Sequence, residues 1–375
     1  MTATSAKEDP VASHTATTTP TAEAQAFYKE LERNHLVALW NVSHALLPRQ
    51  PQSRAVPHLW RWDTLLPLVE RSGAIATPSR GAERRVLGFI NPGLPTRYGA
   101  THTLWAGFQY LLPGEVAPAH RHSPAAIRYV IQGEGAFTTV DGDKCVMGRG
   151  DLVLTPPWTW HDHGNETEEP MIWLDGLDLP MVMEMEGGFY EPFPKDSQPI
   201  ERPVGDSERR YSVGQLRPTW ERWVGPFSPL MNYKWATTEE ALRRLASVGA
   251  SAYDDVAMEY INPHTGGPIM PTLACWIQLL RPGVRTKAHR HTGSAVYLVF
   301  DGQGYSVIDG QRFDWKKGDL FVVPTWACHE HASQDREAIL FSVQDTPILQ
   351  ALGLYREQPY QDHGGHQPIT RVFEG

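Results

Sequence analysis

A stretch of this chain occurs twice, and this duplication constrains the fold more than any other feature of the sequence. Residues 114–122, which contain the triplet His120-Arg121-His122, match residues 283–291 at an offset of 169 residues. Residues 150–163 match residues 318–331 at an offset of 168, so one residue has been lost between the two motifs. Matches at so many positions indicate tandem copies of one domain, each with a matching core of roughly 90 residues.

Both copies are predicted to be all-β. Between residues 101 and 179 the chain consists of short apolar runs separated by Gly, Pro and Asp-Gly, namely LWAGFQYLL, AIRYVIQG, AFTTVDG, DLVLTPP and MIWLDGL. Regularly spaced short strands are typical of a β-sandwich or a β-barrel. The 31 prolines and 32 glycines of the chain also fit a fold with many turns and few long helices.

The segments outside the two copies are predicted to be helical or extended. Apolar residues three to five positions apart predict one amphipathic helix over residues 21–47, and a second over 63–71 with Gly73 just beyond its end. The run Thr237-Thr238-Glu239-Glu240 predicts a capping box that opens a short helix reaching residue 249. The expected plan is a disordered tail (1–20), a helical segment (21–95), the first β domain (96–186), a linker with a short helix (187–260), the second β domain (261–355) and a tail (356–375).

Composition excludes several classes of protein. The 375 residues carry a net charge of −9 and no basic run that could follow a phosphate backbone, so we expect no nucleic-acid partner. No apolar run approaches the roughly 18 residues of a membrane helix. Three cysteines without a C-x-x-C pair argue against a disulfide framework and a thiolate zinc site. Residues 1–20 lack the apolar core of a signal peptide, so we expect a cytoplasmic protein.

The duplicated histidines predict a metal site in each copy. Two histidines at i and i+2 on a strand project from one face, so His120 and His122 can share a metal. His161 follows 39 residues after His122, which is far enough for an antiparallel strand to return beside the first. A single His-x-His would equally suit two solvated side chains on a half-exposed strand, but a duplicated set with a third histidine favours a metal. Three neutral imidazoles suit Zn, Cu, Fe or Ni.

These residues resemble the two sequence motifs of the cupin family. The first motif, G-x5-H-x-H-x3,4-E-x6-G, is met at Gly114, His120, His122 and Gly133. Ala126, and Ala295 in the second copy, occupy the position of the motif's glutamate, so its usual fourth ligand is missing. The second motif, G-x5-P-x-G-x2-H-x3-N, has Trp158 in place of its inner glycine and is otherwise met at Gly150, Pro156, His161 and Asn165.

The missing glutamates, the duplication and several longer phrases make the chain similar to gentisate 1,2-dioxygenase and its relatives that act on salicylate or 1-hydroxy-2-naphthoate. The phrases are GAERRVLGFINPG, HRHSPAAIRYVIQGEG, RGDLVLTPPWTWHDHGN and WLDGLD, and the resemblance extends from about residue 27 to residue 354. It implies an all-β bicupin, with two double-stranded β-helix barrels flanked by the helical segment and linker. It also implies Fe(II) on three histidines, ring cleavage with O2, and a homotetramer.

A salicylate-type substrate would chelate the iron through its carboxylate and ortho hydroxyl, and the carboxylate then needs a cation. Arg128 lies six residues after His122 and would share its strand face if the strand were unbroken, and its apolar neighbours argue against an exposed strand. The resemblance implies that Arg84 also reaches the substrate, although its charged run Glu83-Arg84-Arg85 is typical of a solvated surface.

Four further residues are candidates for the site. His163, two residues after His161, could act as an acid, a base or a hydrogen-bond donor, or could only support the ligand. Asp175 could orient a ligand or bind the distal ring hydroxyl, although Asp-Gly is also an ordinary turn. Trp105 and Gln109 could line the ring pocket, but the matching Gln278 suggests that Gln109 partly serves the shared fold.

The leading hypothesis is therefore a dioxygenase in which Fe(II) on His120, His122 and His161 binds gentisate and O2, and in which cleavage between C1 and C2 yields maleylpyruvate. The alternatives are the same chemistry on salicylate or 1-hydroxy-2-naphthoate, a metal-dependent isomerase or decarboxylase on the same fold, and a ligand-binding bicupin without catalysis. The second cup keeps its histidines, namely His289, His291 and His329. Because Tyr297 stands where the first copy has Arg128, we expect catalysis in the N-terminal domain. The C-terminal cup would then be a structural or vestigial metal site, which could be empty.

Overall fold

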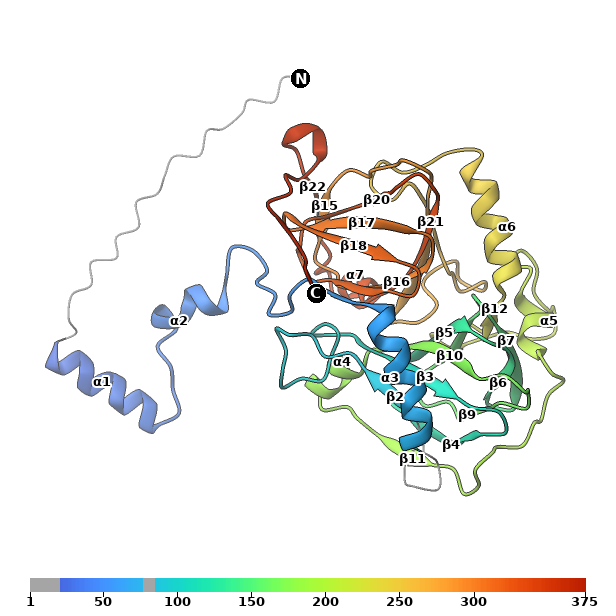
Figure 1. The fold of residues 1–375 in the computed structure, drawn as a ribbon. Coiled ribbons are helices and arrows are strands. Elements are labelled where there is room, and N and C mark those ends of the chain that lie inside the picture. Colours follow the sequence, from blue (N-terminus) through green and yellow to red (C-terminus); the bar gives the residue numbers. More distant parts are fainter. Residues whose placement is uncertain (1–20, 77–84) are drawn as a thin grey trace. The chain divides into compact units, whose positions relative to one another are not determined.

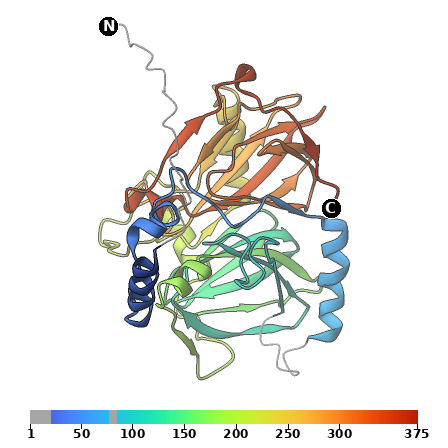
Figure 2. The same ribbon diagram turned by 90° about the vertical axis from the view of Figure 1, so that its left-hand side faces the viewer.

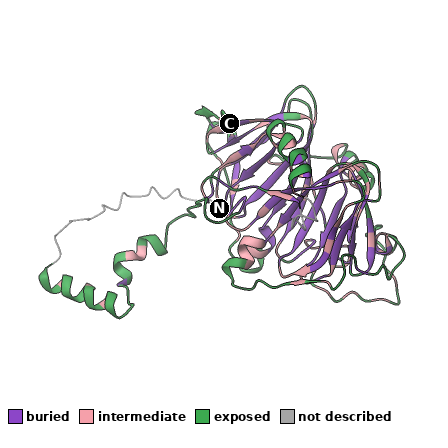
Figure 3. Ribbon diagram, turned by 60° about the horizontal axis from the view of Figure 1, so that its bottom comes forward, coloured by how far each residue is buried: buried purple, intermediate pink, exposed green. Residues whose placement is uncertain are grey.

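The computed structural model describes residues 21–76 and 85–375, which fall into two units that divide between Pro51 and Gln52. The expected disordered tail at residues 1–20 lies outside the described residues. The first unit contains two helices, α1 (Ala22–Arg33) and α2 (Leu39–Leu46), with largely exposed side chains (Figure 3). The prediction of one continuous helix here is wrong. The chain turns at His35, which has a φ of 55°, and this left-handed residue interrupts the helix although the apolar spacing continues.

The second unit contains two β-barrels, each built from two mainly antiparallel sheets, which confirms the predicted bicupin fold (Figure 1). The N-terminal barrel has one sheet in the order β12 (Asn232–Tyr233), β8 (Leu152–Thr155), β5 (Ala126–Gln132), β10 (Met171–Leu177), β3 (Trp105–Leu111) and β2 (Val86–Gly88). Its other sheet has the order β11 (Tyr190–Pro192), β4 (Val116–His122), β9 (His161–Gly164), β6 (Glu134–Val140) and β7 (Asp143–Gly148).

The C-terminal barrel repeats this arrangement. One sheet has the order β1 (His58–Trp60), β19 (Leu320–Val323), β16 (Ala295–Asp301), β21 (Ala338–Gln344), β14 (Ala274–Leu280) and β13 (Val256–Glu259). The other has the order β22 (Glu357–Pro359), β15 (His289–His291), β20 (His329–Ser333), β17 (Gln303–Ile308), β18 (Gln311–Lys316) and β23 (Arg371–Val372). The helices of this unit are α3 (Trp62–Ile75), α4 (Leu179–Glu184), α5 (Asp206–Tyr211), α6 (Trp235–Ala246) and α7 (Thr346–Ala351), followed by a 3-10 turn (His363–Gly365).

The two barrels exchange their first strands. β1 comes before the N-terminal barrel in the chain but pairs with β19 of the C-terminal barrel. In the same way, β12 comes before the C-terminal barrel but pairs with β8 of the N-terminal barrel. The helix after each of these strands returns to the barrel that follows in the chain: α3 packs on β3, and α6 packs on β13 and β14 (Figures 1 and 2). The structural repeat therefore begins well before the part visible in the sequence.

The helix after each exchanged strand is capped at its start by the barrel with which that strand pairs. The backbone amide of Trp62 at the start of α3 donates to Asp319 at 2.7 Å, and that of Trp235 at the start of α6 donates to Asp151 at 2.8 Å. α6 therefore begins two residues before Thr237, and the predicted capping box there is wrong. α3 likewise runs past Gly73 to Ile75, so the prediction that this glycine lies beyond the end of the helix is wrong. A carboxylate from another barrel can satisfy a helix start as well as a local cap does, and neighbouring sequence does not reveal it.

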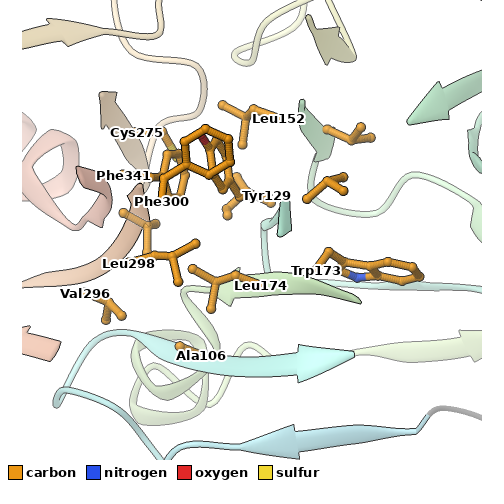
Figure 4. Close-up of a cluster of buried hydrophobic side chains, with 14 of the residues drawn as sticks. Ala106, Tyr129, Leu152, Trp173, Leu174, Cys275, Val296, Leu298, Phe300 and Phe341 are labelled. Atoms are coloured by element: carbon orange, nitrogen blue, oxygen red, sulfur yellow. The ribbon is translucent and has the colours of Figure 1, made fainter. Parts of the chain in front are cut away.

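The barrels pack through the outer faces of their six-stranded sheets. Tyr129 on β5 stacks on Phe341 of β21, with ring centroids 3.8 Å apart and planes 11° apart, and its ring also contacts Phe300 at 5.3 Å (Figure 4). Asp178 accepts from the backbone amide of Ala125 in its own barrel at 2.8 Å and from Thr272 of the other barrel at 2.5 Å. This interface is part of one continuous apolar core that contains residues of both barrels. None of the helices described is long and apolar enough to cross a membrane.

Candidate active site

The first histidine cup lies between β4 and β9 of the N-terminal barrel. The nitrogens that His120, His122 and His161 can offer to a metal all lie within 4.8 Å of one another. Register explains this convergence, because His120 on β4 pairs directly with His161 on β9, and His122 follows two residues later on the same face. His120 and His161 are buried and His122 is half-buried, so the cup has one accessible side.

Backbone carbonyls fix the orientation of all three rings. The Nδ1 atoms of His120, His122 and His161 lie 2.8, 2.8 and 3.0 Å from carbonyl oxygens two residues away in the chain. An imidazole that donates from Nδ1 to a carbonyl presents the lone pair of Nε2 to a metal. Burial, together with the His120 ring and Arg128, holds the pKa of His161 well below its ordinary value, so this ring stays neutral. The donor set therefore fits a first-row transition metal.

Four of the predicted site residues share the face of the six-stranded sheet that looks toward this cup, and a fifth, His163, approaches it from the other sheet. Directly opposed residues of antiparallel strands project to the same side. Arg128 on β5 pairs with Asp175 on β10, which pairs in turn with Gly107 on β3. Trp105 and Gln109 flank Gly107 at two-residue spacing and so share that face. His163, from β9, approaches this face, and its ring lies 5.5 Å from that of Trp173.

Arg128 is a buried cation at the site, although not for the reason predicted. The strand is broken after His122, and Arg128 lies on the next strand, so the premise of one unbroken strand is wrong. Its guanidinium donates from Nη1 to Thr155 at 2.7 Å, and its Nε lies 3.4 Å from the carboxylate of Asp175. Asp175 also accepts a 3.0 Å bond from the indole of Trp173. Asp175 is therefore part of a buried polar network and is not a simple turn residue.

His163 is fully buried and its Nδ1 lies 2.8 Å from the hydroxyl of Thr138. The second copy repeats this pair with His331 and Ser306, also at 2.8 Å, which suggests that the pair partly supports the shared fold. Gln109 is 2% exposed and opposes Trp173.

The remaining tryptophan candidate, Trp105, is half-buried on β3. Its ring covers the backbone of Gly88 and Gly107, where an added Cβ would come within 3.0 and 2.5 Å of ring carbons. These two glycines therefore leave the space in which the ring lies.

Arg84 lies outside the described residues, so its predicted contact with the substrate stays a prediction. The next residue, Arg85, is 6% exposed and forms an ion pair with Glu115, with 3.0 Å between Nη1 and Oε1. That part of the charged run is thus an internal ion pair rather than a solvated surface.

Sequence reasoning missed the strand that covers β4. Tyr190, Glu191 and Pro192 form β11 and pair with His122, Arg121 and His120. The Tyr190 ring stacks on His120, with centroids 5.7 Å apart. The sequence does contain a weak repeat of this strand. Glu357-Gln358-Pro359 lies at an offset of 167, and its strand pairs with β15 in the same way.

Trp158 stands at the glycine position of the second cupin motif and takes the backbone conformation typical of glycine. Its φ is 63°, in the left-handed region that glycine adopts readily, so the turn keeps its shape without the glycine. Its ring is 40% exposed and stacks on the guanidinium of Arg121 at 4.4 Å. The indole thus lies on the surface of the barrel.

The second histidine cup has nearly the same geometry. The nitrogens of His289, His291 and His329 also lie within 4.8 Å of one another, and all three residues are buried. Burial, reinforced by the neighbouring rings, lowers the pKa of His289 to about 4 and that of His329 well below its ordinary value. Tyr297 replaces Arg128 and packs against His331, with ring centroids 5.0 Å apart.

Comparison with known proteins agrees with this architecture. Residues 107–177 and 276–343 each match the family model of the cupin domain, so the chain is a bicupin. It is 42% identical to a 5-aminosalicylate 1,2-dioxygenase from Comamonas sp over 94% of both chains, and 43% identical to gentisate 1,2 dioxygenase 1 from Aquipseudomonas alcaligenes over 90% of this chain and 96% of that one.

A solved structure of salicylate 1,2-dioxygenase from Pseudoaminobacter salicylatoxidans, an adduct with gentisate, matches at a TM-score of 0.87 and 40% identity, covering 92% of this chain and 96% of that one. The chain therefore belongs to the family of gentisate, salicylate and hydroxynaphthoate 1,2-dioxygenases, which are ring-cleaving enzymes. The predicted family and enzyme class are confirmed.

Proposed function

We propose that this enzyme uses Fe(II), held by His120, His122 and His161, to cleave gentisate with O2 between the carboxyl-bearing carbon and the adjacent hydroxyl-bearing carbon. Both oxygen atoms enter the product, maleylpyruvate, so no external reductant is needed. The observation that carries the proposal is the buried Arg128. Its charge acts on His161, and it lies on the sheet face that looks toward the cup. A buried cation beside a metal cup suits a substrate that brings a carboxylate.

Bound iron would supply the one-electron chemistry that allows O2 to react with an aromatic ring. The protein's own residues bind and orient the substrate. Arg128 offers a planar fork of donors to the carboxylate, and Thr155 and Asp175 hold that fork in place. Since Asp175 already accepts from Trp173, we assign it mainly to orienting Arg128 rather than to binding the distal hydroxyl directly.

His163 is the proposed proton donor or acceptor at the ring hydroxyl. Its Nδ1 contacts Thr138, which directs Nε2 toward the interior between the sheets. Trp105 and Gln109, on the same sheet face as Arg128, are proposed to contact the ring. Arg84 is proposed as a second contact to the carboxylate, from the resemblance alone.

Oxygen consumption tests this proposal directly. Fe(II)-loaded protein would be assayed in an oxygen electrode, with ring opening followed by absorbance, against gentisate, salicylate, 5-aminosalicylate and 1-hydroxy-2-naphthoate. We expect one O2 consumed per gentisate and the highest kcat/KM for gentisate. Ring opening of another member of the panel with higher kcat/KM would replace the substrate, and absence of O2 consumption with all four would refute the activity.

A metal-dependent isomerase or decarboxylase remains the alternative chemistry for such a cup, since fold alone does not determine reaction. It would convert substrate under argon as fast as in air. We expect no conversion under argon, because O2 is a co-substrate in the proposed reaction.

We also propose a cytoplasmic homotetramer. The two N-terminal helices support self-association, because they expose large apolar side chains such as Trp40 at 67% and Leu46 at 61%. Light scattering on the full chain should give four times the 42.1 kDa of one chain, and a monomer mass would contradict this. Cell fractionation checks the location, and a processed N-terminus in a secreted or periplasmic fraction would overturn it.

A further inference from the structure

The second cup carries a complete set of metal donors that the proposed reaction does not use. The ring centroids of its three histidines are 5.7, 4.4 and 5.0 Å apart, compared with 5.5, 4.2 and 4.8 Å for the corresponding pairs in the first cup. The Nδ1 atoms of His291 and His329 lie 2.9 and 3.1 Å from the carbonyls of Gly293 and Ala327. These rings are therefore oriented like those of the first cup, with Nε2 left to bind a metal.

The interior of the C-terminal barrel is filled where the first barrel has smaller or polar side chains. Phe313, Trp315 and Phe321 are all buried in the cluster that occupies this barrel. At the matching offset of 168, the first barrel has Cys145, Met147 and Val153. Two positions change the other way, because Trp105 and Trp173 of the first barrel correspond to Ala274 and Leu340, but Phe313, Trp315 and Phe321 add three aromatic rings to the second barrel.

The polar network around Arg128 is also missing from the second barrel. Its counterparts are Tyr297 for Arg128, Ser342 for Asp175 and Val323 for Thr155. The Tyr297 ring stacks on Phe321 with centroids 4.9 Å apart and planes 4° apart, so this position belongs to the apolar packing. A substrate carboxylate would be costly to bury there without a cation.

The charged groups around the second cup favour a metal cation without an anionic organic ligand. His291 is acted on by the carboxylates of Asp345 and Glu357, whereas His161 in the first cup is acted on by Arg128. Asp254 is a further carboxylate near this cup, since it interacts with both Glu357 and Tyr297. A dication would be attracted by these carboxylates, and an anionic ligand would be repelled.

The strand that carries two of these donors is short and lies between two neighbours. β15 comprises only His289–His291, and the pair of His289 with His329 joins it to β20. Just before β15, a separate bridge joins Arg285 to Ala332, and the amide of Thr286 donates to the carbonyl of His331 at 2.9 Å. On its other side β15 pairs with β22, and the Tyr355 ring stacks on His291 with centroids 6.3 Å apart. A metal bound by His289, His291 and His329 would add a side-chain link between β15 and β20 at the end of this paired stretch.

We propose that the C-terminal cup holds a second divalent transition metal in a closed structural site, which cross-links β15 to β20 and takes no organic substrate. The full chain would thus bind two metals for different purposes. Structural metal sites contribute directly to folding free energy.

Metal content and thermal stability test this proposal independently of turnover. The wild-type chain would be loaded anaerobically with Fe(II), or with Zn(II) in parallel, desalted, and measured by plasma mass spectrometry. We expect two equivalents per chain for the wild type and one for His289→Gln, with a lower Tm for that variant. His363→Ala, which changes an exposed histidine of the C-terminal segment, is the matched control and should keep both equivalents.

A second measurement covers the case in which His289→Gln does not fold. His120→Ala removes a ligand of the first cup, and titration of this variant with Co(II) should give one equivalent and the visible absorption of a histidine-bound Co(II) centre. One equivalent in the wild type, or none in His120→Ala, would overturn the proposal. If ring cleavage fails while two equivalents are found, only the proposed function is refuted.

Discussion

Replacement of Arg128 by methionine tests the substrate contact that the proposed function depends on. The variant keeps the length of the side chain but loses the cation and its donors. A hydrogen bond to a charged group contributes about 1.5–3 kcal/mol. Since 1.36 kcal/mol corresponds to a tenfold change, kcat/KM for gentisate should fall by roughly ten- to 150-fold. Arg128→Lys, which keeps the charge without the planar fork, should lose less.

The same substitution also affects stability, and the two effects must be separated. Arg128 and Asp175 are both about 5% exposed, so removing the arginine leaves a buried carboxylate with one partner fewer. Breaking one side of a buried pair destabilises by about 3–5 kcal/mol. The double variant Arg128→Met/Asp175→Asn removes both charges and should recover much of the lost Tm.

Steady-state kinetics and thermal unfolding would be measured on all three variants at matched iron content. The reasoning predicts that the double variant recovers Tm but not kcat/KM. If Arg128→Met kept kcat/KM within threefold of wild type, the arginine would not bind the carboxylate. If the double variant recovered activity together with Tm, the arginine's role would be structural only.

Three further predictions concern metal, titration and packing. Removal of metal with a strong chelator should abolish O2 consumption, and Fe(II) should restore it in the oxygen electrode. Burial raises the pKa of Asp178 from 3.8 to about 6, so the native state holds this proton more tightly than the unfolded chain and stability falls as pH rises between those values. Relative to wild type, Asp178→Asn should therefore gain about 2 kcal/mol in unfolding free energy between pH 4 and pH 6, measured in urea. Gly318→Ala should lower Tm more than Gly283→Ala, because both have positive φ but only the former Cβ would meet Trp62, at 2.4 Å.

The sequence predicts the two cups because their side chains are fixed by motif and register. His120 and His122 share a strand face at two-residue spacing, and His161 returns beside His120 as an antiparallel partner. Buried strands such as β5 and β10 were also predictable, since continuous apolar runs bounded by Gly and Pro identify them. These features depend on neighbouring residues and on one antiparallel pairing, of β4 with β9.

The features that the sequence did not predict correctly depend on the other barrel or on local breaks in the chain. β1 and β12 have three and two residues, too short for any periodicity, and both exist because a distant sheet edge accepts them. The start of α6 is set by Asp151, 84 residues earlier, rather than by its own threonines. The break before Arg128 spans residues 123–125, between β4 and β5, and the carbonyl of Pro124 within it contacts His122 Nδ1 at 2.8 Å.

The strand exchange also explains why the two barrels stay structurally connected although the surroundings of their cups differ. Asp319, at the edge of the C-terminal barrel, holds the amide at the start of α3, and α3 packs on β3 of the N-terminal barrel. β3 carries Trp105 and Gln109 on the face toward the first cup. Loosening of the C-terminal barrel would therefore reach the N-terminal site through β19, β1 and α3. The structural metal proposed for the second cup would stabilise this connection, so its loss should lower the highest temperature at which the first cup stays active, although the proposal places no substrate in the second cup.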